Sequence, residues 1–180
     1  MSIIDERKRL LEDRELRGSE FTLHLSDATD QWLHGLFSSA AENRADLALI
    51  AVGGYGRRDL SPLSDLDVLL LHNDAADIEA VAEALWYPIW DQGEKLGHSV
   101  RTINETLTLA SEDLDTATAL LSSRVIAGSQ ALANELSGKA IDQWKSKAKF
   151  WLPKLAESVH SRHRAKGEVA FMLEPELKEG

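Results

Sequence analysis

Residues 47–72 read LALIAVGGYGRRDLSPLSDLDVLLLH. The apolar run at 45–52 is short, nearly continuous and followed by glycine, which is typical of a strand buried on both faces. A second strand is expected at 65–72, where two aspartates begin another apolar run. A glycine-rich break and a polar connection separate the two runs. The sequence therefore predicts two buried strands on either side of a glycine turn.

Helical patterns surround these two strands. Apolar residues recur at helical spacing through the first forty-odd residues, in one segment that Gly18 ends and a second that Ser19 caps. A helix is expected at 75–91 and a third, partly exposed strand at 95–101. From residue 103 to about 164 the pattern is mostly helical. This order predicts an α+β fold, with a small mixed β-sheet flanked by N- and C-terminal helices.

Composition excludes several classes of protein. The chain has 30 acidic and 20 basic residues in 180, a formal net charge of -10, which argues against a general nucleic-acid binder but leaves room for a local nucleotide site. Cysteine is absent, so no disulfide, thiolate nucleophile or cysteine-ligated zinc is expected. We find no membrane-spanning stretch or secretory signal and expect a cytoplasmic protein with no membrane partner.

Two aspartates lie two positions apart on the second expected strand. Asp65 and Asp67 would therefore point to the same face, about 7 Å apart along the strand. Carboxylates this close repel each other unless a cation lies between them, and hard oxygen ligands select Mg²⁺ or Mn²⁺. A solvated turn is the simpler interpretation of the motif taken alone.

A pair of glycines strengthens the metal interpretation. Gly53 and Gly54 directly follow the first buried strand, where backbone N–H groups can approach an anion without obstruction by side chains. Glycines here would also suit a tight turn. Together with Asp65 and Asp67, they predict a phosphate cradle followed by a pair of metal-binding carboxylates.

The order of these motifs resembles a known superfamily. Val52-Gly53-Gly54, ten residues and then Asp65-Leu66-Asp67-Val68 are similar to the signature of DNA polymerase beta-like nucleotidyltransferases. The whole stretch 53–67 resembles the bacterial PII uridylyltransferases, which also have uridylyl-removing activity. The blocks at 96–102, 116–121 with Arg124, 162–164 and 173–180 are similar to later parts of that family.

This resemblance implies a function. The chain would transfer UMP, or AMP as in actinobacterial relatives, from UTP or ATP to a tyrosine of the signalling protein PII, with release of pyrophosphate. Asp65 and Asp67 would be catalytic and hold Mg²⁺ or Mn²⁺. The resemblance also implies nucleotide-binding residues, which are Gly53, Gly54, Arg57 and Ser64.

The sequence departs from the superfamily at one position. A third carboxylate commonly lies on the following strand, but 95–101 contains none. His98 stands near the expected position, as a metal ligand, a base or a structural histidine. Asp115, which would also suit a helix cap, and Asp91 are possible substitutes for the carboxylate. Arg101 is a further candidate site residue.

We divide the chain into a helical segment at 1–44, a nucleotidyltransferase core at 45–128 and a helical extension at 129–180. An apolar cluster just before the end predicts that the chain is part of a longer protein. Two other functions stay open. In the first, the domain binds a nucleotide for regulation without turnover. In the second, it transfers a nucleotidyl group to a small molecule.

Overall fold

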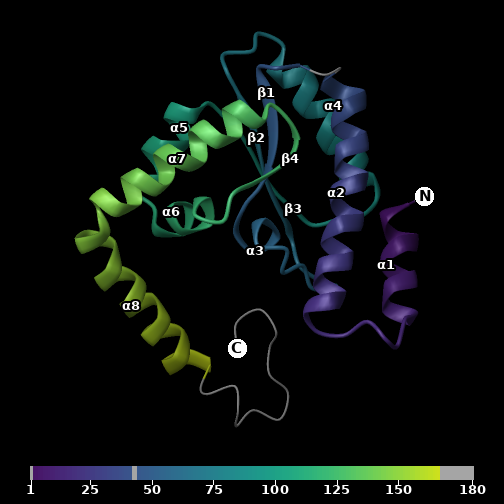
Figure 1. Cartoon of the computed structure of the whole chain (residues 1–180), viewed down its shortest axis with the longest axis horizontal. Coiled ribbons are helices and arrows are strands. Elements are labelled where there is room, and N and C mark those ends of the chain that lie inside the picture. The colour runs from purple at the N-terminus through teal and green to yellow at the C-terminus, as the bar shows by residue number, and fades with distance from the viewer. Residues whose placement is uncertain (1, 42–43, 167–180) are drawn as a thin grey trace.

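The computed structural model describes residues 2–41 and 44–166. These residues form a mixed sheet with helices on both faces (Figure 1). Its four strands are β1 (Leu47–Ala51), β2 (Leu66–His72), β3 (Leu96–Arg101) and β4 (Arg124–Gly128). They lie in the order β3-β2-β1-β4. The predicted α+β class, a small mixed sheet with flanking helices, is confirmed.

The helices divide between the two faces of the sheet. They are α1 (Ile3–Glu12), α2 (Ser19–Ala41), α3 (Gly53–Gly56), α4 (Ile78–Asp91), α5 (Ile103–Ala110), α6 (Leu114–Leu120), α7 (Gln130–Ser146) and α8 (Ala148–Lys166). Side chains of α1, α2 and α4 share one apolar core, and side chains of α5, α6 and α7 share the other. Helix α8 extends from the end of α7 (Figure 1). In the part of the chain described, no helix has the length and apolarity needed to cross a membrane.

Strand β1 is the centre of the fold. It pairs antiparallel with both β2 and β4, while β2 and β3 run parallel and are joined by α4. Every residue of β1 is buried. Leu49 belongs to the core beneath α2 and α4, and Ile50 to the core beneath α5, α6 and α7. Because β1 is buried on both faces, its sequence is continuously apolar rather than alternating.

The structure corrects the mostly helical prediction for residues 103–164. Strand β4 interrupts this segment and pairs with β1 through residues such as Val125 and Ala127. Its three consecutive apolar residues, Val125 to Ala127, are ambiguous between helix and strand when periodicity is the only guide. The backbone of Gly128 supports a turn, since its φ is +86°. The strand completes the sheet and brings Arg124 beside β1.

Three predicted boundaries also change. Helix α1 ends at Glu12, well before Gly18, and Ser19 is the first residue of α2 rather than its cap. The cap of α6 is Asp113, whose carboxylate accepts a hydrogen bond from the Thr116 backbone N–H, so the cap is not Asp115. The family-like block at 173–180 lies outside the described residues.

Candidate functional site

The glycine turn and the aspartate pair lie at the same edge of the sheet. Because β1 and β2 are antiparallel, the end of β1 faces the start of β2. The Val52 N–H donates to the Asp67 carbonyl over 3.0 Å and extends this pairing by one residue. Helix α3 begins at the next residue, Gly53. Strand pairing therefore places the predicted phosphate cradle directly beside Asp67.

The start of α3 has the geometry of an anion-binding turn. Its N-cap residue is Val52, which makes no side-chain hydrogen bond to the turn. The first N–H groups of any helical turn have no acceptor within the helix, and these belong here to Gly53, Gly54 and Tyr55. Gly53 has φ +59°, a left-handed conformation that favours glycine. These N–H groups suit the oxygens of a phosphate chain.

Two glycines make room for the carboxylate of Asp67. A β-carbon added to Gly97 would lie 2.2 Å from Asp67 Oδ1, a separation that real β-carbons do not show. A β-carbon added to Gly53 would lie 3.7 Å from Asp67 Oδ2. Gly97 is the register partner of Asp67 across the parallel β2–β3 pair. The carboxylate therefore lies between the glycine turn and the neighbouring strand.

Asp65 and Asp67 line one cleft of about 590 Å³. The cleft continues along the loop between α3 and β2, and its other lining residues are Gly54, Tyr55, Asp59, Leu60, Ser61, Pro62, Leu63 and Ser64. Leu63 is 89% exposed, which is unusual for a leucine and places an apolar side chain at the cleft. The cleft thus combines a charged end at the aspartates with a mainly apolar wall.

Two other predicted nucleotide contacts lie near this cleft. Arg57 follows α3, and a β-carbon on Gly54 would be 3.9 Å from its Nη2 atom. Its Nε atom is 2.9 Å from Asp59 Oδ2, in an ion pair that is more than half exposed. Ser64 lines the cleft, and its hydroxyl accepts a hydrogen bond from the Ser61 backbone N–H over 2.9 Å.

The remaining candidates lie away from the aspartate pair. His98 alternates with Gly97 on β3 and points to the opposite face, where its ring centroid is 5.4 Å from those of Trp86 and Trp90. These two ring contacts place the exposed His98 side chain away from Asp67. Arg101 is on the face of Gly97 but four residues farther along β3, about 13 Å by strand rise.

The two carboxylates considered as substitutes have separate positions. Asp115 is an exposed residue in the first turn of α6, on the same helical face as Ala119, which approaches Gly53. Asp91 ends α4, which packs on the opposite face of the sheet from Asp67. Within residues 2–41 and 44–166, no group of three or more acidic or histidine side chains is arranged to hold a metal ion.

A donor set of two carboxylates still fits a catalytic Mg²⁺. Magnesium keeps several water ligands and is commonly held by one or two carboxylates together with substrate phosphates. Here the space left by Gly97 accommodates the Asp67 carboxylate, and the adjacent glycine turn offers N–H groups for those phosphates. Asp65 and Asp67 would hold the ion, and the nucleotide would complete its coordination.

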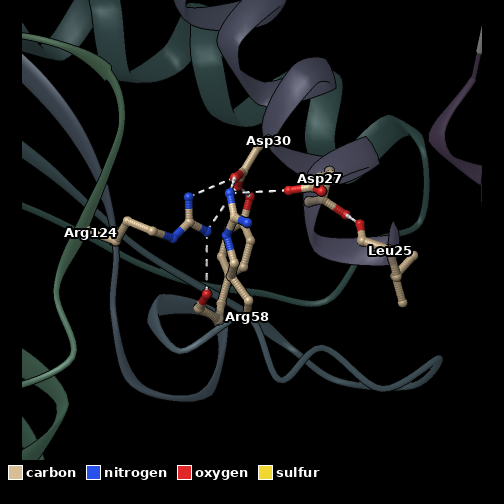
Figure 2. Close-up of polar contacts among 7 residues, drawn as sticks. Leu25, Asp27, Asp30, Arg58 and Arg124 are labelled. Atoms are coloured by element: carbon tan, nitrogen blue, oxygen red, sulfur yellow. Dashed lines mark hydrogen bonds and ion pairs between the residues drawn. The ribbon is translucent and has the colours of Figure 1, made fainter. Parts of the chain in front are cut away.

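The sequence interpretation assigned no role to three side chains that meet at the glycine turn. Asp30 of α2, Tyr55 of α3 and Arg124 of β4 form one hydrogen-bonded group next to the turn (Figure 2). Their separations of 25 and 94 residues leave no local pattern that would connect them. A tyrosine inside a glycine-rich break was the one available signal, since a buried phenol needs a hydrogen-bond partner.

Three relatives of this chain share the name "Bifunctional uridylyltransferase/uridylyl-removing enzyme". The relative from Streptomyces coelicolor is 43% identical over 175 residues, which cover 96% of this chain and 21% of that protein. The relative from Mycobacterium tuberculosis is 47% identical over 135 residues, covering 74% and 17%. The chain belongs to this family. The relative from Phenylobacterium zucineum is 37% identical over 180 residues, covering 91% and 19%.

The resemblance to uridylyltransferases drawn from residues 53–67 is therefore confirmed. The chain spans about a fifth of the length of these bifunctional uridylyltransferase relatives. No family model matches it. A solved structure titled "Crystal structure of the toxin-antitoxin with AMP-PNP" aligns with 72% of this chain and 98% of that one, at 15% identity and a TM-score of 0.45.

Proposed function

We propose that this chain is the nucleotidyl-transferring part of a cytoplasmic enzyme that modifies PII. It would transfer UMP or AMP from the nucleoside triphosphate to a tyrosine hydroxyl of PII and release pyrophosphate. The observation that carries the proposal is the position of Asp67 between Gly53 and Gly97, at the end of a cleft that Asp65 also lines. The names of the family members support nucleotidyl transfer.

Each group has a role that follows from its position. The N–H groups at the start of α3 would bind the β- and γ-phosphates and orient the α-phosphorus toward the aspartates. Asp65 and Asp67 would hold Mg²⁺ or Mn²⁺, which when bound lowers the pKa of the acceptor hydroxyl and neutralises charge on the phosphates.

The reaction has a simple balance. The tyrosine oxygen forms a bond to the α-phosphorus, and the bond from that phosphorus to the oxygen bridging to the β-phosphate breaks. The phenolic proton passes to solvent water, pyrophosphate leaves with the bridging oxygen, and the nucleoside monophosphate stays on the tyrosine. Arg57, at the edge of the glycine turn, would supply positive charge near the departing phosphates.

The test is intact-mass spectrometry of PII after incubation with this chain, Mg²⁺ and either UTP or ATP. We expect the mass of one UMP or AMP on PII, no addition without Mg²⁺, and none with Asp65→Ala/Asp67→Ala. Asp142→Ala, which removes an exposed carboxylate on α7, is the matched control and should keep the activity.

Two outcomes would favour the other functions. If the wild-type chain binds the nucleotide but leaves PII unmodified and releases no pyrophosphate, a regulatory nucleotide-binding domain is supported. If pyrophosphate is released only when a small-molecule acceptor replaces PII, the chain is a nucleotidyltransferase with a different acceptor. Mass addition that survives Asp65→Ala/Asp67→Ala would contradict the site itself.

A further inference from the structure

The carboxylate of Asp30, on α2, is bonded to the glycine turn and to β4. The Tyr55 hydroxyl donates to Asp30 Oδ1 over 2.7 Å. Arg124 donates to both oxygens of the same carboxylate, over 2.6 Å from Nη1 and 3.0 Å from Nη2. Figure 2 shows the guanidinium groups of Arg124 and Arg58 beside the carboxylate of Asp30. Asp30 thus connects α2, the glycine turn and β4, which are far apart in the sequence.

Tyr55 is held at two places by this group. Its hydroxyl bonds to Asp30, and its backbone carbonyl accepts a hydrogen bond from Arg124 Nη2 over 3.4 Å. The Arg124 guanidinium also lies 5.5 Å from the centre of the Tyr55 ring, within the range of a cation–π contact. Since Tyr55 is the third residue of a four-residue helix, fixing both of its ends fixes the turn.

The contacts are partly or fully removed from water. Tyr55 is 1% exposed, and the side chains of Asp30 and Arg124 are 19% and 24% exposed. Burial, the charge of Asp30 and its hydrogen bond raise the pKa of Tyr55 above its ordinary value, so the phenol stays a donor. Burial alone would lower the pKa of Arg124, but Asp30 and Tyr55 outweigh it and the net direction is upward. Charge-assisted hydrogen bonds in such surroundings hold their geometry firmly.

A second pair strengthens the attachment. Arg58 has φ +63°, an uncommon conformation for a side chain with a β-carbon. In this conformation its Nη2 atom lies 3.1 Å from Asp27 Oδ1 and 4.0 Å from Asp30 Oδ2. The chain leaving α3 is thereby directed toward α2, to which Asp27 and Asp30 both belong.

The opposite side of the turn is packed against backbone. A β-carbon on Gly56 would lie 2.0 Å from the Ser122 carbonyl oxygen, so the turn lies directly on the segment before β4. Gly53, three residues earlier, borders the Asp67 carboxylate. A shift of Tyr55 would therefore change the distance between the phosphate-binding N–H groups and the metal-binding carboxylate.

We propose that Asp30, Tyr55 and Arg124 are positioning residues for nucleotidyl transfer, which set the separation between the glycine turn and Asp67. This inference rests on the proposed function and adds to it that α2 helps to align the triphosphate. Removal of the Tyr55 hydroxyl is the most specific test of this role, because it leaves the buried ring and the Asp30–Arg124 pair in place.

Kinetics and amide hydrogen exchange together test the inference. For Tyr55→Phe, we expect kcat for transfer from MgUTP or MgATP to fall about tenfold, the effect of one charge-assisted hydrogen bond, while KM for PII is unchanged. Exchange of the amides at 53–57 should increase several-fold, whereas exchange in β2 should not. Arg124→Lys, which keeps the charge but loses the paired donors, should show the same pattern.

Glu94→Gln is the matched control. It weakens a partly buried ion pair, between Arg7 and Glu94, that does not contact the turn. The positioning role is overturned if the amides at 53–57 of Tyr55→Phe exchange at the wild-type rate. It is also overturned if Glu94→Gln and Tyr55→Phe lower kcat equally. A wild-type chain without transferase activity would refute the proposed function. Because hydrogen exchange needs no turnover, the exchange data would still decide whether Tyr55 fixes the turn.

Discussion

The carboxylate of Asp67 occupies space that only glycine leaves open at position 97. A β-carbon on Gly97 would stand 2.2 Å from Asp67 Oδ1, and the two residues face each other in the β2–β3 register. The third carboxylate of the superfamily was expected near His98, which is next to Gly97. Gly97 is thus the residue that makes room for the carboxylate of Asp67. We infer that β3 serves this site by leaving space, and that its own side chains contribute little to the charge.

Gly97→Ala should reduce activity more than it reduces stability. The atom it would displace is the end of a side chain, so Asp67 can rotate away without moving the backbone. Misplacement of a metal-binding carboxylate by about 1 Å costs roughly a hundredfold in rate. We expect such a loss in transfer to PII, with a melting temperature close to wild type.

Gly138→Ala is the control for this substitution. Gly138 lies within α7, and nothing stands within 4 Å of a β-carbon there. Alanine in a helix interior stabilises by about 1 kcal/mol relative to glycine. Unchanged transfer by Gly97→Ala would show that the carboxylate does not need its present position.

Gly56→Ala should instead reduce the stability of the fold. Its β-carbon would meet two backbone oxygens, at 2.0 Å from Ser122 and 3.1 Å from Ala51, and neither can rotate away. Overpacking of this kind costs about 1–3 kcal/mol in the free energy of unfolding, which urea denaturation would measure. Gly35→Ala, in an open position on α2, should not destabilise the protein. Equal stability of Gly56→Ala and wild type would contradict the close packing of α3.

The sequence predicted the parts of the site that depend on neighbouring residues. Two apolar runs on either side of a glycine break were enough to place Gly53 and Asp67 on adjoining elements. The mixed sheet followed from the same runs and the alternation at 95–101. These features depend on burial and on strand period, both of which are local properties of the chain.

Features that depend on register or on distant contacts were not predictable. Whether His98 or Gly97 shares a face with Asp67 changes with a one-residue shift in the β2–β3 pairing, which the sequence does not specify. Strand β4 was hidden because three apolar residues among helices, Val125 to Ala127, have no distinct period. Asp30 and Arg124 meet only after α2 and β4 have packed together.

Acid should remove the stabilising effect of the Asp113 cap. The hydrogen bonds from the Thr116 hydroxyl and backbone N–H lower the pKa of Asp113 in the folded state. Since the folded pKa lies below the unfolded value of about 3.9, the stabilisation is present above that value and is lost as pH falls through the folded pKa.

Asp113→Asn isolates this charge, because asparagine also caps helices well. We expect it to lower the free energy of unfolding by about 0.3–1 kcal/mol at pH 7, with solvent screening keeping the effect small. The difference from wild type should shrink steadily from pH 5 to pH 2, as followed by urea denaturation. Asp115→Asn, an exposed carboxylate two residues later, is the control. A difference that persists at pH 2 would mean that the charge of Asp113 is irrelevant to the cap.

Divalent metal should bind firmly only together with the nucleotide. Asp65 and Asp67 line the cleft, Asp59 on the same cleft pairs with Arg57, and no group of three or more acidic or histidine side chains in the described residues is arranged to hold a metal, so phosphate oxygens and water must supply the other ligands. Titration with Mn²⁺, followed by its electron paramagnetic resonance signal, should show weak binding alone and at least tenfold tighter binding with a non-hydrolysable UTP or ATP analogue. Asp67→Asn should abolish this coupling, while Asp142→Ala should retain it. Tight Mn²⁺ binding without nucleotide would instead indicate further protein ligands and would refute a two-carboxylate site.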